Sequence, residues 1–296
     1  MATELINKMA VIGVGLIGGS LALALKRAGV VRHISGWDTD PENLQLAEAL
    51  QVVDTAATSA ADAVCSADVV VLAVPVGSMA AAAQAVLPYM RSGSVLSDTG
   101  SVKQCVVEQV EPLARQAGVH FVAAHPISGT EHSGAAAAFA ELFSGKRCIV
   151  TYGAATDTAA LELVSALWRA VGSEVVCMDT LKHDRILAAI SHLPHMIAYA
   201  LVNSVSAYDQ YDENILDYSA GGFRDFTRIA SSDPVMWRDI ALANKGALLE
   251  MIEQFEGFLA ELKQDIHRGD GGRLYEFFRR SKNSRDALLH KEAKER

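Results

Sequence analysis

Few features of secreted, metal-binding or membrane proteins occur in this sequence. It holds only four cysteines in 296 residues. They form no C-x-x-C pair and have no histidines beside them at zinc spacing, which argues against a disulfide framework and against a zinc site. No run of eighteen or more uncharged apolar residues is present, and the N-terminus lacks the pattern of a signal peptide. We therefore expect a cytoplasmic protein that does not span a membrane and holds no metal.

Positive charge is also scarce. The chain has 26 Lys and Arg residues against 35 Asp and Glu residues, for a formal net charge of −9. This balance argues against a nucleic-acid-binding surface. Any anionic substrate must therefore be held by a few well-placed cations. The length is sufficient for two domains with a sizeable core, and no internal repeat divides it.

The clearest motif is a glycine-rich turn near the N-terminus. A short apolar run, Met9–Ile12, leads into glycines 13, 15 and 18, and residues 16–25 follow as an Ala- and Leu-rich helix. A strand, a glycine turn and a helix in this order are typical of dinucleotide-binding folds. Gly13 would allow the tight turn, Gly15 would let the backbone approach a pyrophosphate, and Gly18 would let the helix pack closely on the strand.

An acidic residue stands where such a fold needs one. Asp38 follows a second short strand, His33–Trp37, and comes twenty residues after Gly18. A carboxylate there suits the ribose hydroxyls of NAD and would repel the 2′-phosphate of NADP. The alternative is an ordinary strand–helix junction with a surface aspartate. We predict NAD as the cofactor, bound by Gly13, Gly15, Leu16, Ile17, Gly18, Asp38, Val74 and Pro75.

Strand and helix patterns alternate as far as Met178, whereas only helical patterns follow. Alternation of this kind predicts an α/β fold with a doubly wound, Rossmann-type parallel sheet. We therefore predict an NAD-binding domain over residues 1–178 and an all-helical substrate and dimerisation domain over residues 179–296.

Two long helices are expected in the second half. The first covers Leu181–Tyr208 and contains Pro194, which should kink or break it. Residues 211–227 are expected to form a loop, and a second helix should begin at Pro234 and run to about His267. Apolar side chains on this second helix exceed what one small bundle needs to cover itself, which favours a helical dimer interface: Leu248, Leu249, Ile252, Phe255, Phe258, Leu259 and Leu262.

Polar segments follow several of the predicted strands. Residues 98–103 and 125–131 come directly after buried strands, and ligands of open parallel sheets bind beyond the carboxyl ends of the strands. His125 is the candidate general base, because an imidazole can take up a proton near pH 7 and a dehydrogenase must remove a hydroxyl proton. The alternative is a hydrogen-bonded structural histidine.

The helical half offers a second polar cluster. Residues 191–195, with the sequence S-H-L-P-H, place His192 and His195 near one helix face. A metal site is an alternative here, but no third ligand stands out. Arg224 and Arg228 lie beside a glycine pair, and arginine suits a carboxylate best, although both arginines could simply face solvent.

Together these motifs resemble the prephenate/arogenate dehydrogenase family of tyrosine biosynthesis over nearly the whole chain. Five motifs carry the resemblance: G-V-G-L-I-G-G-S at 13–20, D-T-G-S-V-K at 98–103, H-P-I-S-G-T-E at 125–131, S-H-L-P-H at 191–195 and G-G-F-R-D-F-T-R-I-A-S-S-D-P-V-M-W at 221–237. The last three of them are specific to that family.

The resemblance implies a role for each matching residue. His125 would accept the proton of the substrate's ring hydroxyl, Ser101 would hydrogen-bond that hydroxyl, and Arg228 would bind a carboxylate. Trp237 would be able to approach the site from a second subunit. The full set of substrate-binding residues that the resemblance implies is Ser191, His195, Arg228, Asp225, Thr130, Glu131 and Trp237.

The implied reaction is NAD-dependent oxidative decarboxylation of prephenate, arogenate or both by a homodimer. We expect the bare catalytic form, without a mutase-like segment or a regulatory domain. Two other functions stay open. A β-hydroxyacid or 6-phosphogluconate-type dehydrogenase would need a catalytic lysine, Lys182 or Lys245, but neither lies in a glycine-rich setting. A non-catalytic NAD-binding sensor would leave His125, His195 and Arg228 without a use.

Overall fold

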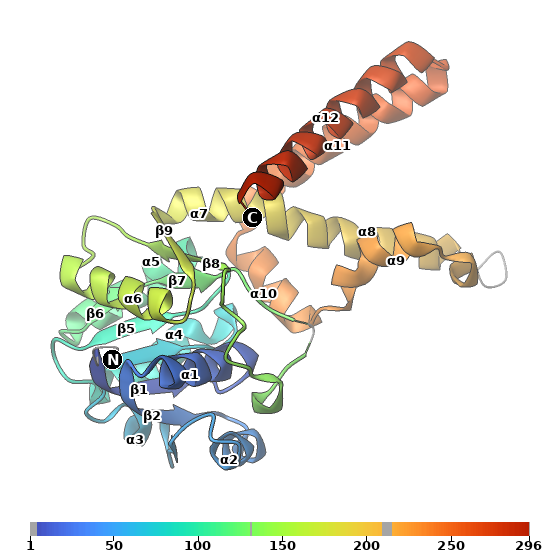
Figure 1. Cartoon of the computed structure of the whole chain (residues 1–296). Coiled ribbons are helices and arrows are strands. Elements are labelled where there is room, and N and C mark those ends of the chain that lie inside the picture. The colour runs from blue at the N-terminus through green and yellow to red at the C-terminus, as the bar shows by residue number, and fades with distance from the viewer. Residues whose placement is uncertain (1–4, 131, 209–214, 296) are drawn as a thin grey trace. The chain divides into compact units, whose positions relative to one another are not determined.

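The computed structural model describes residues 5–130, 132–208 and 215–295, with side chains as far as residue 290. The chain divides into two compact units, residues 1–245 and residues 246–296, which we describe separately (Figure 1). This division falls far beyond the predicted domain boundary. The boundary at residue 178 therefore stays a prediction.

A six-stranded parallel sheet forms the centre of the first unit, with the strand order β3-β2-β1-β4-β5-β6. The chain therefore begins in the middle of the sheet, builds outward to one edge, and then crosses back to build the other half. This topology confirms the predicted doubly wound sheet. The strands are β1 (Ile6–Ile12), β2 (Val31–Trp37), β3 (Thr55–Ala56), β4 (Val69–Leu72), β5 (Val95–Asp98) and β6 (His120–Val122).

Helices cover both faces of this sheet. Alternate residues of each strand point to opposite faces, so Met9 and Val69 enter one apolar cluster, whereas Ala10 and Val70 enter the other. The first cluster is covered by α1 (Leu16–Ala28), α2 (Pro41–Ala49) and α6 (Thr158–Ala170). The second is covered by α3 (Ala60–Val64), α4 (Met79–Val86) and α5 (Gln104–Gln116).

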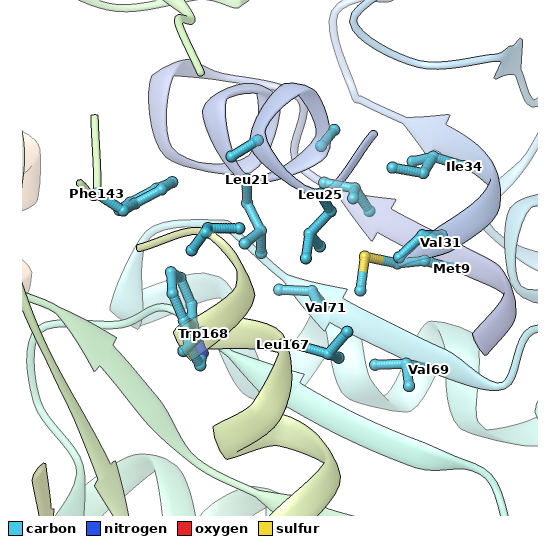
Figure 2. Packing of buried hydrophobic residues seen from close by; sticks show 14 of the residues in the cluster. Met9, Leu21, Leu25, Val31, Ile34, Val69, Val71, Phe143, Leu167 and Trp168 are labelled. Carbon is cyan, nitrogen blue, oxygen red and sulfur yellow. The ribbon is translucent and has the colours of Figure 1, made fainter. Parts of the chain in front are cut away.

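Figure 2 shows the first of these clusters from close by. Leu21 and Leu25 of α1 point toward Met9 and Val71 on the sheet, and Trp168 of α6 packs beside them. Leu25 is fully buried. Truncating such a leucine to alanine typically costs about 2–5 kcal/mol. This packing fixes α1, and with it the glycine turn, against the sheet.

A second, three-stranded sheet was not expected from the sequence. It consists of β7 (Ala124–Pro126), β8 (Arg147–Thr151) and β9 (Glu174–Met178), with β7 antiparallel to β8 and β8 parallel to β9. The single strand expected directly before residue 125 is in fact divided at Ala123, whose carbonyl accepts a hydrogen bond from the Thr151 N–H at 2.8 Å. The division places His125 inside β7 rather than after a strand.

Only helices follow β9 among the described residues. The helix α7 (Thr180–Leu187) passes through a π-helical turn, Ala188–His192, into α8 (Leu193–Tyr208). Pro194 lies in the first turn of α8, directly after the π-helical turn, and the helical run continues through it from Thr180 to Tyr208 without a break.

The stretch from α7 to α8 is also notably apolar. By length and composition alone, Thr180–Tyr208 could cross a membrane, with a mean hydropathy of 1.4 over its most apolar window. Apolar helices that pack in soluble proteins meet the same criterion. Only 22% of that window is buried within the chain.

The segment before the last long helices is more helical than predicted. Residues 209–214 lie outside the described residues, so the loop predicted over 211–227 is tested only in part. Residues 215–231 form three short helices, of which the second begins at the glycine pair: η5 (Ile215–Tyr218), α9 (Gly221–Thr227) and η6 (Arg228–Ser231). The helix α10 (Pro234–Ala243) follows, with Asp233 as its N-cap.

The prediction of one helix from Pro234 to His267 is wrong. The helix α10 instead ends at Asn244. The side chain of Asn244 donates a hydrogen bond to the Asp184 carbonyl at 2.8 Å and lies 3.1 Å from the Nδ1 atom of His192. These tertiary contacts hold Asn244 out of helical geometry, with φ −106° and ψ 31°.

A hairpin of two long helices makes up the second unit. The helices are α11 (Lys245–Arg268) and α12 (Gly271–Glu295), joined where Gly269 adopts a positive φ of 65°. Phe258 and Phe277 make an edge-on ring contact, and the Arg273 guanidinium donates to the Asp265 carboxylate at 2.9 Å. Apolar side chains remain exposed on this hairpin: Leu249, Phe258, Leu259, Ile266, Tyr275 and Phe278.

Candidate active site

The glycine turn between β1 and α1 has the geometry that a dinucleotide requires. Gly13 adopts a φ of +92°, which side-chain-bearing residues rarely reach. A Cβ atom on Gly18 would lie 2.2 Å from the Gly13 carbonyl oxygen, so only glycine fits there. A Cβ atom on Gly15 would meet nothing within 4 Å, which leaves the backbone open to a ligand. No side chain among the described residues caps the N-terminus of α1 at Gly15.

Asp38 is fixed at the end of β2 beside this turn. Its Oδ2 atom accepts a hydrogen bond from the Val14 N–H at 2.8 Å, and its Oδ1 atom accepts one from the Asp40 N–H at 3.0 Å. Val74 lies beside Gly13, since a Cβ atom on that glycine would come within 3.0 Å of the valine side chain. Pro75 follows Val74 and is exposed. The residues predicted to bind NAD are therefore gathered around one turn, and their geometry fits such a group.

A buried ion pair ties the loop after β5 to the start of β7. Lys103 is fully buried, and its Nζ atom pairs with the Asp98 carboxylate and donates to the Ala124 carbonyl at 2.8 Å. The Ala124 N–H donates in turn to Asp98 at 3.2 Å. This arrangement holds the half-buried Ser101 on the same loop and fixes the backbone next to His125.

His125 lies at the end of a buried chain of polar groups. It is 8% exposed, and its Nδ1 atom lies 2.9 Å from the Nε2 atom of His183. The Nδ1 atom of His183 lies 2.7 Å from Asp184 Oδ1. The Asp184 carboxylate also accepts hydrogen bonds from the backbone N–H groups of Lys103 at 2.8 Å and Gln104 at 2.9 Å. The Nε2 atom of His125 has no hydrogen-bond partner in the parts of the chain that the structure describes.

Burial keeps the histidines of this region neutral near pH 7. It lowers the pKa of His125 well below the ordinary histidine value, and the positive charge of Lys103 lowers it further. Burial also lowers the pKa of His183, against an opposing hydrogen bond to Asp184. The pKa of His192 falls to about 4, chiefly because of burial.

The second predicted cluster is assembled around Trp237. The rings of His195 and Trp237 are stacked, with centroids 3.7 Å apart and an interplanar angle of 23°. The Nδ1–H of His195 donates to the Ser191 carbonyl at 2.8 Å. Burial lowers the pKa of His195, the hydrogen bond to Ser191 raises it, and the positive charge of Arg228 lowers it further.

Apolar contacts bring the two clusters together. Trp237 and Ile240 pack with Val102, which separates Ser101 from Lys103, and with Val76, which follows Pro75. The loops after β4 and β5 and the helix α10 therefore border one region. Within its own chain Trp237 stacks on His195, and its approach to the site of a second subunit stays a prediction.

The remaining predicted residues that the structure describes are exposed and make few side-chain contacts. Thr130 is exposed, and its Oγ1 atom accepts a hydrogen bond from the His132 N–H at 3.3 Å. Asp225 and Arg228 are exposed, and their side chains make no hydrogen bond or ion pair with other described residues. Glu131 lies outside the described residues.

A metal at the two histidines of the S-H-L-P-H motif is not supported by their surroundings. The Nδ1 atom of His192 faces Asn244, whereas His195 is stacked on Trp237. Within residues 5–130, 132–208 and 215–295, no group of three or more His, Cys, Asp or Glu side chains could hold a metal ion.

Sequence reasoning overlooked four residues that organise the site: Lys103, His183, Asp184 and Asn244. One signal was available, because His183 and Asp184 are adjacent polar residues on the buried face of α7. Their meaning depends on a contact 58 residues away in the chain, between His183 and His125, which no local pattern reveals.

Comparisons with known proteins agree with this geometry. Residues 21–177 match the family model "Prephenate dehydrogenase, nucleotide-binding domain", and residues 179–280 match "Prephenate dehydrogenase, dimerization domain". The chain is 39% identical to the cyclohexadienyl dehydrogenase of Zymomonas mobilis, over 95% of each sequence.

Two solved structures are similar over most of the chain. One is the prephenate dehydrogenase of Aquifex aeolicus in complex with hydroxyphenyl propionate and NAD+, with a TM-score of 0.90, 36% identity, and coverage of 97% of this chain and 99% of that one. The other is the arogenate dehydrogenase of Synechocystis, with a TM-score of 0.79, 26% identity, and coverage of 95% and 99%. The chain therefore belongs to the prephenate dehydrogenase family.

Proposed function

We propose that the protein is an NAD-dependent dehydrogenase that oxidatively decarboxylates prephenate, arogenate or both, in tyrosine biosynthesis. The observation that carries the proposal is the setting of His125. It is buried, neutral near pH 7 and, among the residues that the structure describes, bonded through only one of its two ring nitrogens. The substrate class rests on family membership and on relatives named for cyclohexadienyl, prephenate and arogenate oxidation.

The glycine turn and Asp38 are the residues that would hold the cofactor. The backbone at Gly15 and the N-terminus of α1 are open to a pyrophosphate, and Asp38 is placed for the ribose hydroxyls. When bound, NAD+ accepts a hydride from the substrate carbon that bears the ring hydroxyl. The carboxylate of Asp38 disfavours the 2′-phosphate of NADP, so NAD is the preferred cofactor.

His125 acts as the general base of the reaction and later returns the proton that it has taken up. Its Nε2 atom accepts the hydroxyl proton as the hydride leaves, and Ser101 hydrogen-bonds the same oxygen. Loss of CO2 from the para carbon then makes the ring aromatic and places negative charge on that oxygen. The imidazolium returns the proton to it, so that the balance is substrate plus NAD+ to a phenol, CO2 and NADH. Aromatisation makes the sequence effectively irreversible.

Arg228 is the carboxylate-binding residue of this proposal. His195 donates its Nδ1–H to Ser191, so in its neutral form it presents a lone pair at Nε2 and cannot donate to an anion there. The positive charge of Arg228 acts on this imidazole, and the guanidinium has no partner among the described residues. It can bind a carboxylate through two parallel hydrogen bonds. Asp225, Thr130 and Glu131 remain proposed lining residues.

A homodimer built from the helical residues, in the cytoplasm, completes the proposal. The family model for residues 179–280 describes a dimerization domain, and α11 and α12 expose Leu249, Phe258 and Ile266. A second copy would bury such apolar surface, including that of the Thr180–Tyr208 stretch. Size-exclusion chromatography with light scattering should give twice the 31.6 kDa chain mass. A monomer at micromolar concentration would contradict this part.

Steady-state kcat/KM for prephenate and for arogenate, each with NAD+ and with NADP+, tests the activity. We expect turnover of at least one substrate and a clear preference for NAD+. The ratio between the two substrates decides which of them the enzyme mainly uses. Equal use of NADP+ would contradict the role of Asp38, and failure with all four combinations would favour a non-catalytic NAD-binding protein.

A further inference from the structure

The buried chain from Asp184 to His125 determines where each proton lies. Asp184 accepts two backbone N–H groups, those of Lys103 and Gln104, at 2.8 and 2.9 Å. An ionised carboxylate only accepts hydrogen bonds, so the 2.7 Å contact between Asp184 and His183 requires a proton on Nδ1 of His183.

The next link follows from the same reasoning. A neutral imidazole carries one N–H, so a proton on Nδ1 of His183 leaves a lone pair on its Nε2 atom. The 2.9 Å contact with His125 then requires that Nδ1 of His125 carries the proton and donates it. In neutral His125 the remaining nitrogen, Nε2, is therefore unprotonated, which is the form that a general base needs.

The chain is anchored at its far end by the fold. The carbonyl of Asp184 accepts a hydrogen bond from the Asn244 side chain at 2.8 Å, which ties the middle of α7 to the end of α10. His183 is fully buried and Asp184 is 5% exposed, so water does not compete for their hydrogen bonds. Neither residue is placed to touch the substrate, because His125, the least buried of the three, stands at the outer end of this chain of hydrogen bonds.

We propose that His183 is a positioning residue that, anchored by Asp184, fixes His125 as the tautomer with an unprotonated Nε2 atom. When His125 takes up a proton, its Nδ1–H still donates to His183, so the imidazolium is stabilised without rearrangement. The effect on turnover rests on the proposed role of His125 as the base, whereas the tautomer itself does not.

Nitrogen NMR of the free protein tests the tautomer directly. Protein labelled with ¹⁵N-histidine is measured without ligands, and the signals of His125 are identified by their loss in His125→Asn. We expect the Nδ1 signal of a protonated nitrogen and the Nε2 signal of an unprotonated one. A protonated Nε2 in the wild-type protein would overturn the proposal, and this measurement needs no folded variant of His183.

Variants at His183 separate positioning from packing. In His183→Leu the acceptor is lost, so the proton of His125 should shift toward Nε2 and kcat should fall by roughly tenfold to a hundredfold with little change in KM. In His183→Gln the side-chain oxygen can accept a hydrogen bond from Nδ1 of His125, so the wild-type nitrogen signals and most of kcat should return. An unchanged pattern in His183→Leu would contradict the proposal.

His192→Gln is the matched control. His192 is equally buried and also belongs to the Asn244 network, but no ring contact or hydrogen bond joins it to His125. Its substitution should leave the His125 nitrogen signals unchanged, and a changed pattern would show that general loosening of the region moves the proton. If the tautomer is found as expected but neither prephenate nor arogenate is turned over, the proposed function fails and the positioning role stands.

Discussion

A Cβ atom on Gly18 would lie 2.2 Å from the carbonyl oxygen of Gly13, which is far inside the contact distance of carbon and oxygen. Gly18→Ala should therefore force α1 away from the turn. We expect a loss of about 1–3 kcal/mol in the free energy of unfolding, together with loss of NAD+ binding. Thermal denaturation and NAD+ titration by tryptophan fluorescence measure the two effects.

Gly15→Ala is the matched variant, because apart from its neighbours in the chain its Cβ atom would meet no described residue within 4 Å. Its melting temperature should equal that of the wild type, whereas its affinity for NAD+ should fall because the methyl group occupies space left for the pyrophosphate. Unchanged NAD+ affinity in Gly15→Ala would exclude this turn as the phosphate site.

His125→Asn should lower kcat by roughly 10²- to 10⁴-fold, the usual contribution of a general base, while KM and NAD+ affinity change little. Steady-state kinetics with the preferred substrate provide the check. The low pKa of His125 also means that the base is unprotonated at neutral pH, so wild-type activity should fall only below the ordinary histidine range. A variant that keeps near-normal turnover would rule out His125 as the base.

Arg228→Ala should raise KM by roughly tenfold to a hundredfold, because the substrate carboxylate loses a charge-assisted partner worth about 1.5–3 kcal/mol. Arg224→Ala is the control: Arg224 is exposed and its Nε–H donates to the Ser219 hydroxyl at 3.3 Å. The reverse pattern, with KM raised only by Arg224→Ala, would move the anion site to Arg224.

Acid should destabilise the protein in a window set by its buried histidines. The pKa of His192 is about 4 in the folded state and near 6.5 when unfolded, so between these values the unfolded state binds more protons. The contribution of His192 to the free energy of unfolding is complete above pH 6.5 and is lost as the pH falls toward 4. The loss is on the order of 3 kcal/mol in total. Urea denaturation at about pH 7 and pH 5 should show a smaller pH dependence for His192→Gln, and an equal dependence would contradict the assignment.

Much of the fold could be predicted because its signals are local. The glycine turn before α1 and the start of α10 at Pro234 each identify an element from neighbouring residues. The division of the strand at Ala123 could not be predicted, since it depends on a hydrogen bond from Thr151. The end of α10 at Asn244 depends in the same way on Asp184 and His192.

Sequence motifs identify several residues of the candidate site, but they do not identify the buried residues that hold them. His125, His195 and Arg228 stand in motifs that can be recognised in the sequence. Lys103 also stands in such a motif, but its full burial and its pairing with Asp98 appear only when β5 and β7 are brought together. His183 and Asp184 lie outside every motif, so their contact with His125 was visible only in three dimensions.

The most direct test of the account is to mix the purified protein with NAD+ and prephenate, and separately with arogenate, and to follow NADH absorbance and CO2 release together. The account predicts that NADH and CO2 appear in equal amounts with at least one substrate, and that His125→Asn slows both equally. The absence of NADH with both substrates, or NADH formation without CO2, would contradict it.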